Sequence, residues 1–428
     1  MDLPPTNSTA WNPSKKFLFR FLFLYFFLYC FPFPLDAFDF LAPVAKPYYN
    51  FIDWLIPIIG KKYFHLTAHI AFPGFDKVDD SYYGLVFMYL ILIVSLAVAL
   101  LWSILDRKRK EYEKLYEWLR LYLRCFLVAY LFGYGFVKVF PSQFQEITAS
   151  ILTMTVGDQS PMLLAWNFMG YSPVLMKLNG LVEVIAGLLL LFRRTTTMGA
   201  ILSAGTFGFI MVMDFCFNVP VRLLASHLLL ISLFLVAGDR RRLLNVFVLN
   251  KPAVAATYKP FINHPIWRKA FSVFLILLAI SLLYSTIVKG IDAEKSFGRK
   301  APRVPLYGVY DAVYFLRNND TIPALETDSL RWKQLVIDGV SWNQAGIIRF
   351  STGKRNSFTA EADTLKHTLT LQSQSDTTQK YLFHYSIRGK DQILLKGLWK
   401  KDSIEILMNK YNLDNYILHR EKFKWITD

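Results

Sequence analysis

Residues 82–105 read YYGLVFMYLILIVSLAVALLWSIL, a run without a single charged side chain. A helix rises about 1.5 Å per residue, so about 20 apolar residues cross the ~30 Å hydrocarbon core of a bilayer. Other apolar stretches of similar character lie at residues 17–33, 121–140, 173–192, 198–213, 221–237 and 270–288. The sequence therefore predicts an α-helical polytopic membrane bundle with about seven transmembrane helices.

Basic residues cluster between alternate apolar stretches. The clusters lie at residues 107–110, 193–194, 240–242 and 268–269. Once the helices alternate in direction, all of them fall on one side of the membrane, and short loops rich in Lys and Arg stay in the cytoplasm. We therefore expect the N-terminus inside and the C-terminus outside. Topology and anionic lipid also account for the formal net charge of +16, so no nucleic-acid partner is expected.

The first stretch, residues 17–33, is predicted to stay in the protein as a helix. It follows Lys15 and Lys16, contains Arg20, and ends in Phe31-Pro32-Phe33-Pro34. A cleaved signal peptide is the alternative, but such peptides end in small residues at the cleavage site, and this stretch does not.

Residues 35–81 hold an apolar, aromatic run from Tyr48 to Ile59 that is broken by Pro57 and followed by Gly60. The run is too short and too interrupted to span a bilayer. We expect it to lie at the outer interface, where Trp and Tyr rings sit at headgroup level. A lid over a pocket is the functional alternative.

The sequence pattern changes from Leu306 onward. Short alternating stretches at residues 307–315, 331–337, 367–371, 381–387, 393–398 and 404–408 are separated by turn-forming clusters such as Asp338-Gly339 and Arg388-Gly389-Lys390-Asp391. Eight to nine strands at this spacing predict a small antiparallel β-barrel of lipocalin-like type, or a β-sandwich. Two domains are thus expected, a transmembrane one at residues 1–291 and an extracytoplasmic one at 300–428.

Glu183 is the strongest candidate for a functional residue. It lies in Gly180-Leu-Val-Glu-Val-Ile-Ala-Gly187, near the middle of a predicted helix. An ionised carboxylate there costs at least a few kcal/mol, so Glu183 should be protonated or paired, and it is a candidate catalytic group. The alternative is a neutral Glu183 that hydrogen-bonds a neighbouring helix, since the small residues Gly180 and Gly187 favour close helix contact.

Asp214, Arg222 and His227 surround a tight turn between two predicted helices. Asp214 and Arg222 are candidates for binding a polar quinone or lipid headgroup, and His227 is a candidate for proton transfer that would meet Glu183 or Asp214 across the bundle. The alternative is an Asp214–Arg222 ion pair that closes the hairpin, with His227 as a buried hydrogen-bond donor.

Lys138 occupies the last turn of the predicted helix at residues 121–140. Its ammonium either snorkels to the membrane surface or faces inward, where desolvation would make it a candidate general base.

Weaker candidates complete the set. Trp166 and Asn167 add polar groups near the outer end of the predicted helix bundle, and we assign them to cofactor binding. His65 and His69 have a spacing used for metals, but two His without acidic partners at motif spacing do not predict a metal site. Cys30, Cys125 and Cys216 are scattered along apolar stretches, a pattern typical of buried thiols rather than disulfides.

The segments Gly133–Phe140, Gly180–Arg194 and Asn218–His227 resemble the DoxX-like membrane proteins, in the longer Bacteroidota form with an added outer domain. The likeness covers about residues 120–242 and implies a four-helix membrane core, with Glu183 as the matching residue; some relatives are subunits of quinone-linked oxidoreductases. The aromatic first helix with Arg20 is also distantly similar to the helical part of vitamin K-dependent carboxylases, which would make Lys138 a base.

Two functions follow from these expectations. The first is an inner-membrane subunit of a redox-linked system, whose outer-leaflet pocket binds a quinone as cofactor, or a lipid. The second is a non-catalytic envelope assembly or binding protein, whose periplasmic β-domain recruits a protein partner. The sequence does not decide whether the chain is an enzyme.

Overall fold

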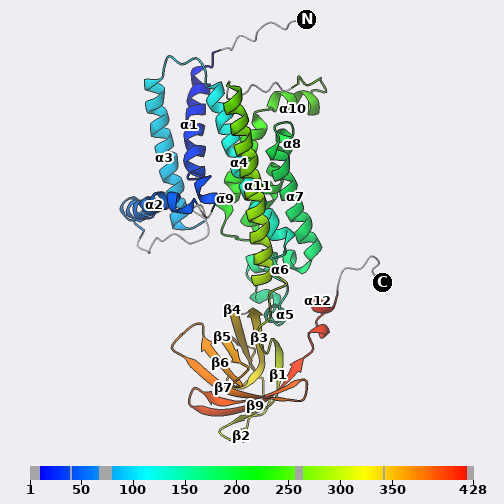
Figure 1. Ribbon diagram of the computed structural model, residues 1–428. Coiled ribbons are helices and arrows are strands. Elements are labelled where there is room, and N and C mark those ends of the chain that lie inside the picture. The colour runs from blue at the N-terminus through cyan, green and yellow to red at the C-terminus, as the bar shows by residue number, and fades with distance from the viewer. Residues whose placement is uncertain (1–9, 39–40, 67–79, 256–263, 341–342, 422–428) are drawn as a thin grey trace. The chain divides into compact units, whose positions relative to one another are not determined.

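The computed structural model describes residues 10–38, 41–66, 80–255, 264–340 and 343–421. These residues form two compact units (Figure 1). The first unit comprises Met1–Val139 and Lys177–Gly290, and the second comprises Phe140–Met176 and Ile291–Asp428. Residues 140–176 therefore group with the C-terminal residues, whereas a division at residues 291–300 was expected from the sequence.

The first unit is helical. Its helices are α1 (Pro13–Cys30), α2 (Ala42–Tyr63), α3 (Tyr82–Leu105), α4 (Glu113–Val139), most of α7 (Pro173–Leu191), α8 (Thr196–Cys216), α9 (Arg222–Ala237), α10 (Arg240–Phe247) and most of α11 (Pro265–Ser296), with the short η1 (Leu35–Ala37). Within the described ranges, six helices are long and apolar enough to cross a membrane. The pair α9 and α10, bent by 77°, makes a seventh if it is one span. The prediction of about seven membrane helices is confirmed.

Helix α2 is continuous although Pro47 and Pro57 lie inside it. It runs crosswise to α3 (Figure 1), packs on α3 and η1, and buries Ile52 and Ile56. The hydroxyl of Tyr83 on α3 donates to the Asp53 carboxylate at 2.7 Å. The run of residues 48–59 is thus one part-buried amphipathic helix; its predicted place at the outer interface stays a prediction.

Helices α4 and α7 approach closely because glycines face each other. A Cβ added at Gly180 would lie 2.5 Å from the carbonyl oxygen of Gly135, and one added at Gly135 would lie 2.8 Å from a methyl of Val184. Neither position has room for a larger side chain. The expectation that Gly180 and Gly187 mark a helix contact is confirmed, since a Cβ at Gly187 would lie 2.7 Å from the Phe132 ring.

The second unit contains a closed antiparallel β-barrel. Its strands are β1 (Gly308–Arg317), β2 (Asp320–Thr321), β3 (Trp332–Val340), β4 (Asn343–Phe350), β5 (Arg355–Asp363), β6 (Thr368–Ser373), β7 (Lys380–Arg388), β8 (Gln392–Trp399) and β9 (Asp402–Tyr411). Neighbours in the order β1-β3-β4-β5-β6-β7-β8-β9 are hydrogen-bonded, and β9 pairs back with β1, while β2 only extends the edge of β1. Of the two expected architectures, the barrel is the one that forms.

Some strands were expected from the sequence and others were not, depending on how clearly their core residues alternate with polar ones. Inward-facing residues include Leu335 and Ile337 on β3 and Leu369 and Leu371 on β6, which alternate with outward-facing ones. Strands β4 and β5 were not among the expected segments. The core residues of β5 are Phe358 and Ala360, too weak an alternation to stand out from its polar neighbours.

Residues 140–176 pack on the barrel through α5 (Ala149–Leu152), and they also include η2 (Val156–Asp158) and α6 (Pro161–Tyr171). Ala149 is buried with Val309 and Val336. The backbone N–H of Ser150 donates to the Asp338 carboxylate at 2.8 Å, and Arg355 donates to the Thr153 carbonyl at 3.1 Å. The chain after β9 ends its described part with η3 (Leu413–Asn415) and α12 (Ile417–Arg420).

Candidate functional site

Lys138 on α4 and Glu183 on α7 form an ion pair inside the helical unit. The Lys138 Nζ lies 2.5 Å from Glu183 Oε1, and the two side chains are 6% and 3% exposed. The lysine therefore faces inward and does not snorkel. The Gly135–Gly180 contact one turn away brings the two helices close enough for this pair to form.

The second carboxylate oxygen of Glu183 takes no part in this ion pair. Among the described residues, Glu183 Oε2 is buried and has no hydrogen-bond partner. A buried acceptor without a partner costs about 1–3 kcal/mol, so such an atom in a native protein calls for an explanation, of which a ligand or a bound water is one.

Asp214, near the end of α8, is a second buried carboxylate, 5% exposed. Its Oδ2 likewise has no hydrogen-bond partner in the part of the chain that the structure describes. Asp214 interacts electrostatically with Lys138, Asp80 and Arg222. The structure thus groups two carboxylates and one ammonium, all buried between apolar helices.

Arg222 does not close the hairpin with Asp214. Its Nε donates instead to Asp80 Oδ2 at 2.6 Å, and Asp80 also accepts the backbone N–H groups of Arg222 and Leu223 at 3.1 and 3.0 Å. Asp80 thereby satisfies free N–H groups at the start of α9, where a negative charge is favourable. The Asp214–Arg222 ion pair that we gave as the alternative does not form, because Asp80, from the segment before α3, binds the guanidinium instead. The position of Asp80 just before the apolar stretch at residues 82–105 was the only signal for it in the sequence. Nothing in that position identified Arg222 as its partner.

His227 lies against α1. Its Nδ1 is 2.6 Å from the Leu223 carbonyl, which only accepts, so Nδ1 carries the proton and Nε2 accepts from the Tyr25 hydroxyl at 2.7 Å. The imidazole also stacks on Tyr29, with ring centroids 4.5 Å apart. These contacts agree with the alternative role of His227, that of a buried hydrogen-bond donor. None of them joins His227 to Glu183 or Asp214.

Two candidates, Trp166 and Asn167, belong to the second unit. Trp166 packs on Phe144 with ring centroids 5.1 Å apart, and the Asn167 amide donates to the Gln159 side chain at 3.0 Å. Their assignment to cofactor binding stays a prediction.

His65 is exposed, and His69 lies outside the described residues. No cluster of three or more His, Cys, Asp or Glu suited to a metal occurs within the described segments.

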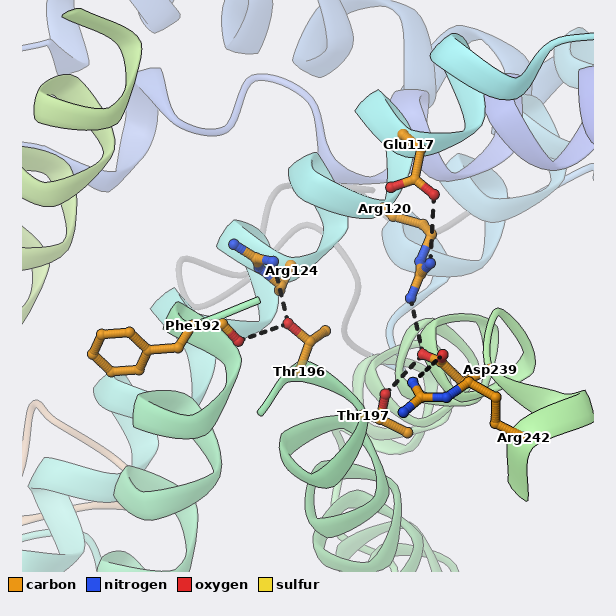
Figure 2. A network of polar contacts seen from close by, with 8 residues as sticks. All are labelled: Glu117, Arg120, Arg124, Phe192, Thr196, Thr197, Asp239 and Arg242. Atoms are coloured by element: carbon orange, nitrogen blue, oxygen red, sulfur yellow. Dashed lines mark hydrogen bonds and ion pairs between the residues drawn. The ribbon is translucent and has the colours of Figure 1, made fainter. Parts of the chain in front are cut away.

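Asp239, between α9 and α10, organises a separate polar network (Figure 2). Its carboxylate accepts from Thr197 at 2.7 Å, from Arg242 at 3.0 Å and from Arg120 at 3.4 Å. Nearby, Arg124 donates to the Thr196 hydroxyl at 3.2 Å (Figure 2). One carboxylate thus holds α4, α8 and α10 together at the bend, and the basic residues in this network bind protein groups.

Arg20 on α1 is a further buried cation, although an arginine is usually exposed. It is 4% exposed and donates to the Tyr112 hydroxyl at 2.6 Å, the Ser103 hydroxyl at 2.9 Å and the Asp106 carbonyl at 2.9 Å. The guanidinium ties α1 to the end of α3 and to the residue before α4.

Comparison with known proteins gives one informative similarity. The chain is 34% identical over 113 residues to the uncharacterized protein YwoB of Bacillus subtilis (strain 168), a match that covers 26% of this chain and 71% of that protein. No family model matches the chain, and no solved structure matches it.

Proposed function

We propose a function for this chain, which belongs to the family of the uncharacterized Bacillus subtilis protein YwoB, from its own residues. It is a multi-pass protein of the bacterial inner membrane that binds the polar head of a quinone-like molecule. The binding group is the buried cluster of Lys138, Glu183 and Asp214. In this proposal the β-barrel lies in the periplasm, and the protein serves as a subunit of a redox-linked membrane system.

One observation carries the proposal. Glu183 Oε2 and Asp214 Oδ2 are buried acceptors without a hydrogen-bond partner among the described residues, and both belong to groups that interact with the Lys138 ammonium. Ionisable groups inside a membrane domain are costly and commonly functional. A quinol hydroxyl would donate to either carboxylate, and a quinone carbonyl would accept from Lys138.

The DoxX-like resemblance supports the same assignment, because Glu183 is the residue that it matches. Some DoxX-like proteins are subunits of quinone-linked oxidoreductases. The resemblance to the carboxylases adds nothing to this proposal, since here Lys138 is engaged by Glu183.

The second function, envelope assembly without catalysis, has one observation in its favour. The Lys138–Glu183 pair lies beside the Gly135–Gly180 contact, so the same residues also fasten two helices to each other. In that case the cluster is structural, and the barrel recruits the partner protein.

Quinone content decides between the two functions. We would purify the full chain from quinone-containing membranes and measure co-purifying quinone by mass spectrometry. The Glu183→Gln variant keeps the shape of the side chain but removes its charge, and it should lose the quinone. Glu117→Gln is the matched control, because Glu117 is half exposed and pairs only loosely with Arg120 at 3.6 Å; it should retain the quinone.

Folded wild-type protein without quinone would refute the proposal. Equal quinone content in Glu183→Gln and Glu117→Gln would do the same and would leave the assembly function standing. A melting curve for each variant shows that the comparison is made between folded proteins.

A further inference from the structure

Helix α10 turns away from the direction of the long helices. It is bent by 77° from α9, and Figure 1 shows it crosswise to them, at the end of the bundle where α8 begins. Its eight residues rise about 12 Å, far less than the ~30 Å hydrocarbon core of a bilayer. Its first turn is Arg240-Arg241-Arg242, and charged side chains are costly inside that core. The helix is therefore suited to lie along a membrane surface and not to cross the membrane.

The two sides of α10 differ in polarity. Arg241 and Asn245 are four residues apart and share one side, whereas Leu243 and Phe247, also four apart, share another side with Val246. The apolar side is open, since Phe247 is 76% exposed and Val246 is exposed too. A helix with a basic side and an exposed apolar side is typical of those that lie in the headgroup region of a bilayer.

Three arginines near α10 already bind protein groups. Arg120 and Arg242 share the Asp239 carboxylate, and Arg124 donates to the Thr196 hydroxyl (Figure 2). The charge of Asp239 is thus balanced by two cations, and this carboxylate is not available to further basic residues.

Other arginines at this end of the bundle have no such partner. Arg240 and Arg241 are exposed and form no ion pair with any residue in the described ranges. Arg194 is likewise exposed without an ion pair there, three residues before Thr197, which donates to Asp239. Protein groups therefore leave part of the positive charge unbalanced. The basic clusters predict that this end faces the cytoplasm, where the leaflet contains anionic lipid.

We propose that α10 binds an anionic phospholipid of the cytoplasmic leaflet. Arg240 and Arg241 bind the phosphate of the headgroup, and the side with Phe247 lies against the acyl chains. A soluble anion would leave that apolar side in water, so a lipid is the better occupant. The site lies at the beginning of α8, about 25 Å along this helix from Asp214 at 1.5 Å per residue. It is therefore separate from the proposed quinone site.

The proposal is tested by native mass spectrometry of the full chain, delipidated in detergent and titrated with phosphatidylglycerol or phosphatidylcholine. We expect the wild type to bind phosphatidylglycerol more tightly. Each basic residue at an anionic lipid surface contributes about fivefold in affinity, so Arg240→Gln combined with Arg241→Gln should weaken phosphatidylglycerol binding about thirtyfold. Phosphatidylcholine binding should stay the same. Phe247→Gln should weaken the binding of both lipids, because both have acyl chains.

Arg107→Gln combined with Lys108→Gln is the matched control. It removes the same charge on the same predicted side of the membrane, from exposed residues between α3 and α4 that form no ion pair within the described segments. This variant should bind phosphatidylglycerol as the wild type does.

Equal affinity of the wild type for the two lipids overturns the proposal, as does equal weakening in the two double variants. Displacement of phosphatidylglycerol by an equimolar amount of glycerol phosphate would indicate a site for soluble anions and overturn the lipid. Melting curves check that the variants are folded. Should the arginine variant fail to fold, Phe247→Gln still tests the site, because wild-type affinity for phosphatidylglycerol in that variant would contradict the role of the apolar side.

Discussion

At the residue scale, the Lys138–Glu183 pair has a stability consequence that is separate from any ligand. Both side chains are almost fully buried. Removing one partner of such a pair costs about 3–5 kcal/mol, because a buried charge is left alone, whereas replacing both with apolar residues is often neutral or stabilising.

We therefore predict that Lys138→Met lowers the melting temperature of the full chain, and that Lys138→Met combined with Glu183→Leu restores it. Thermal unfolding in nanodiscs measures both. Lys177→Met serves as the control, because Lys177 lies exposed at the beginning of α7, and it should leave the melting temperature unchanged. If the double variant melts no higher than Lys138→Met alone, Glu183 does not need Lys138 as its counter-ion.

At the element scale, the α4–α7 contact depends on glycines that have no space beside them. A Cβ at Gly180 would meet the Gly135 carbonyl oxygen at 2.5 Å and the Val139 nitrogen at 2.8 Å. Both are backbone atoms, so the helices would have to move apart. That movement would also stretch the ion pair one turn away.

Gly180→Ala is accordingly expected to destabilise the protein by about 1–3 kcal/mol, the usual cost of overpacking. Gly205→Ala on α8 provides the comparison, because a Cβ there meets nothing within 4 Å, and Ala is favoured over Gly in a helix by about 1 kcal/mol. Chemical unfolding of the two variants should give opposite signs relative to the wild type. Equal effects would mean that the close contact does not contribute to stability.

At the scale of the whole molecule, the second unit is built from two separate parts of the chain. Residues 140–176 bury Ala149 against Val309 and Val336 of the barrel. A fragment cut near Lys295 contains all nine strands and has the length of a small domain, so it should fold as a β-rich protein without disulfides.

We predict that this fragment is stabilised by a synthetic peptide of residues 140–160. The peptide restores the buried Ala149 and the Ser150–Asp338 hydrogen bond. Circular dichroism should show the β-rich fold, and melting curves should show a rise that saturates with peptide. The same peptide with Ala149→Glu places a charge in the apolar contact and should have no effect. A disordered fragment, or equal effects of both peptides, would contradict the packing described above.

The orientation in the membrane is also a property of the whole chain. The basic clusters predict the N-terminus inside and the C-terminus outside. A reporter active only outside the cytoplasm should work when fused after Asp428, and a cytoplasmic reporter should work when inserted at residues 249–253. The opposite result at either place would change the number of spans.

The sequence by itself determined most of the elements. Seven apolar stretches, the turn-separated strands after residue 306 and the small residues at Gly180 and Gly187 are local features, because helix length, strand alternation and glycine size act within a few neighbouring residues. Strand β5 was not expected from the sequence for the same reason, because its apolar inward residues alternate too weakly with its polar ones.

The tertiary structure alone decided the partners. Asp80 binds Arg222 across 142 positions, and Tyr25 binds His227 across 202. The Lys138 ammonium faces inward because α7 brings Glu183 to it. Closure of the barrel likewise required β1 to pair with β9. A polar side chain carries its chemistry in the sequence, but its distance to any other group is set by how the helices and strands pack, and that packing depends on all of them at once.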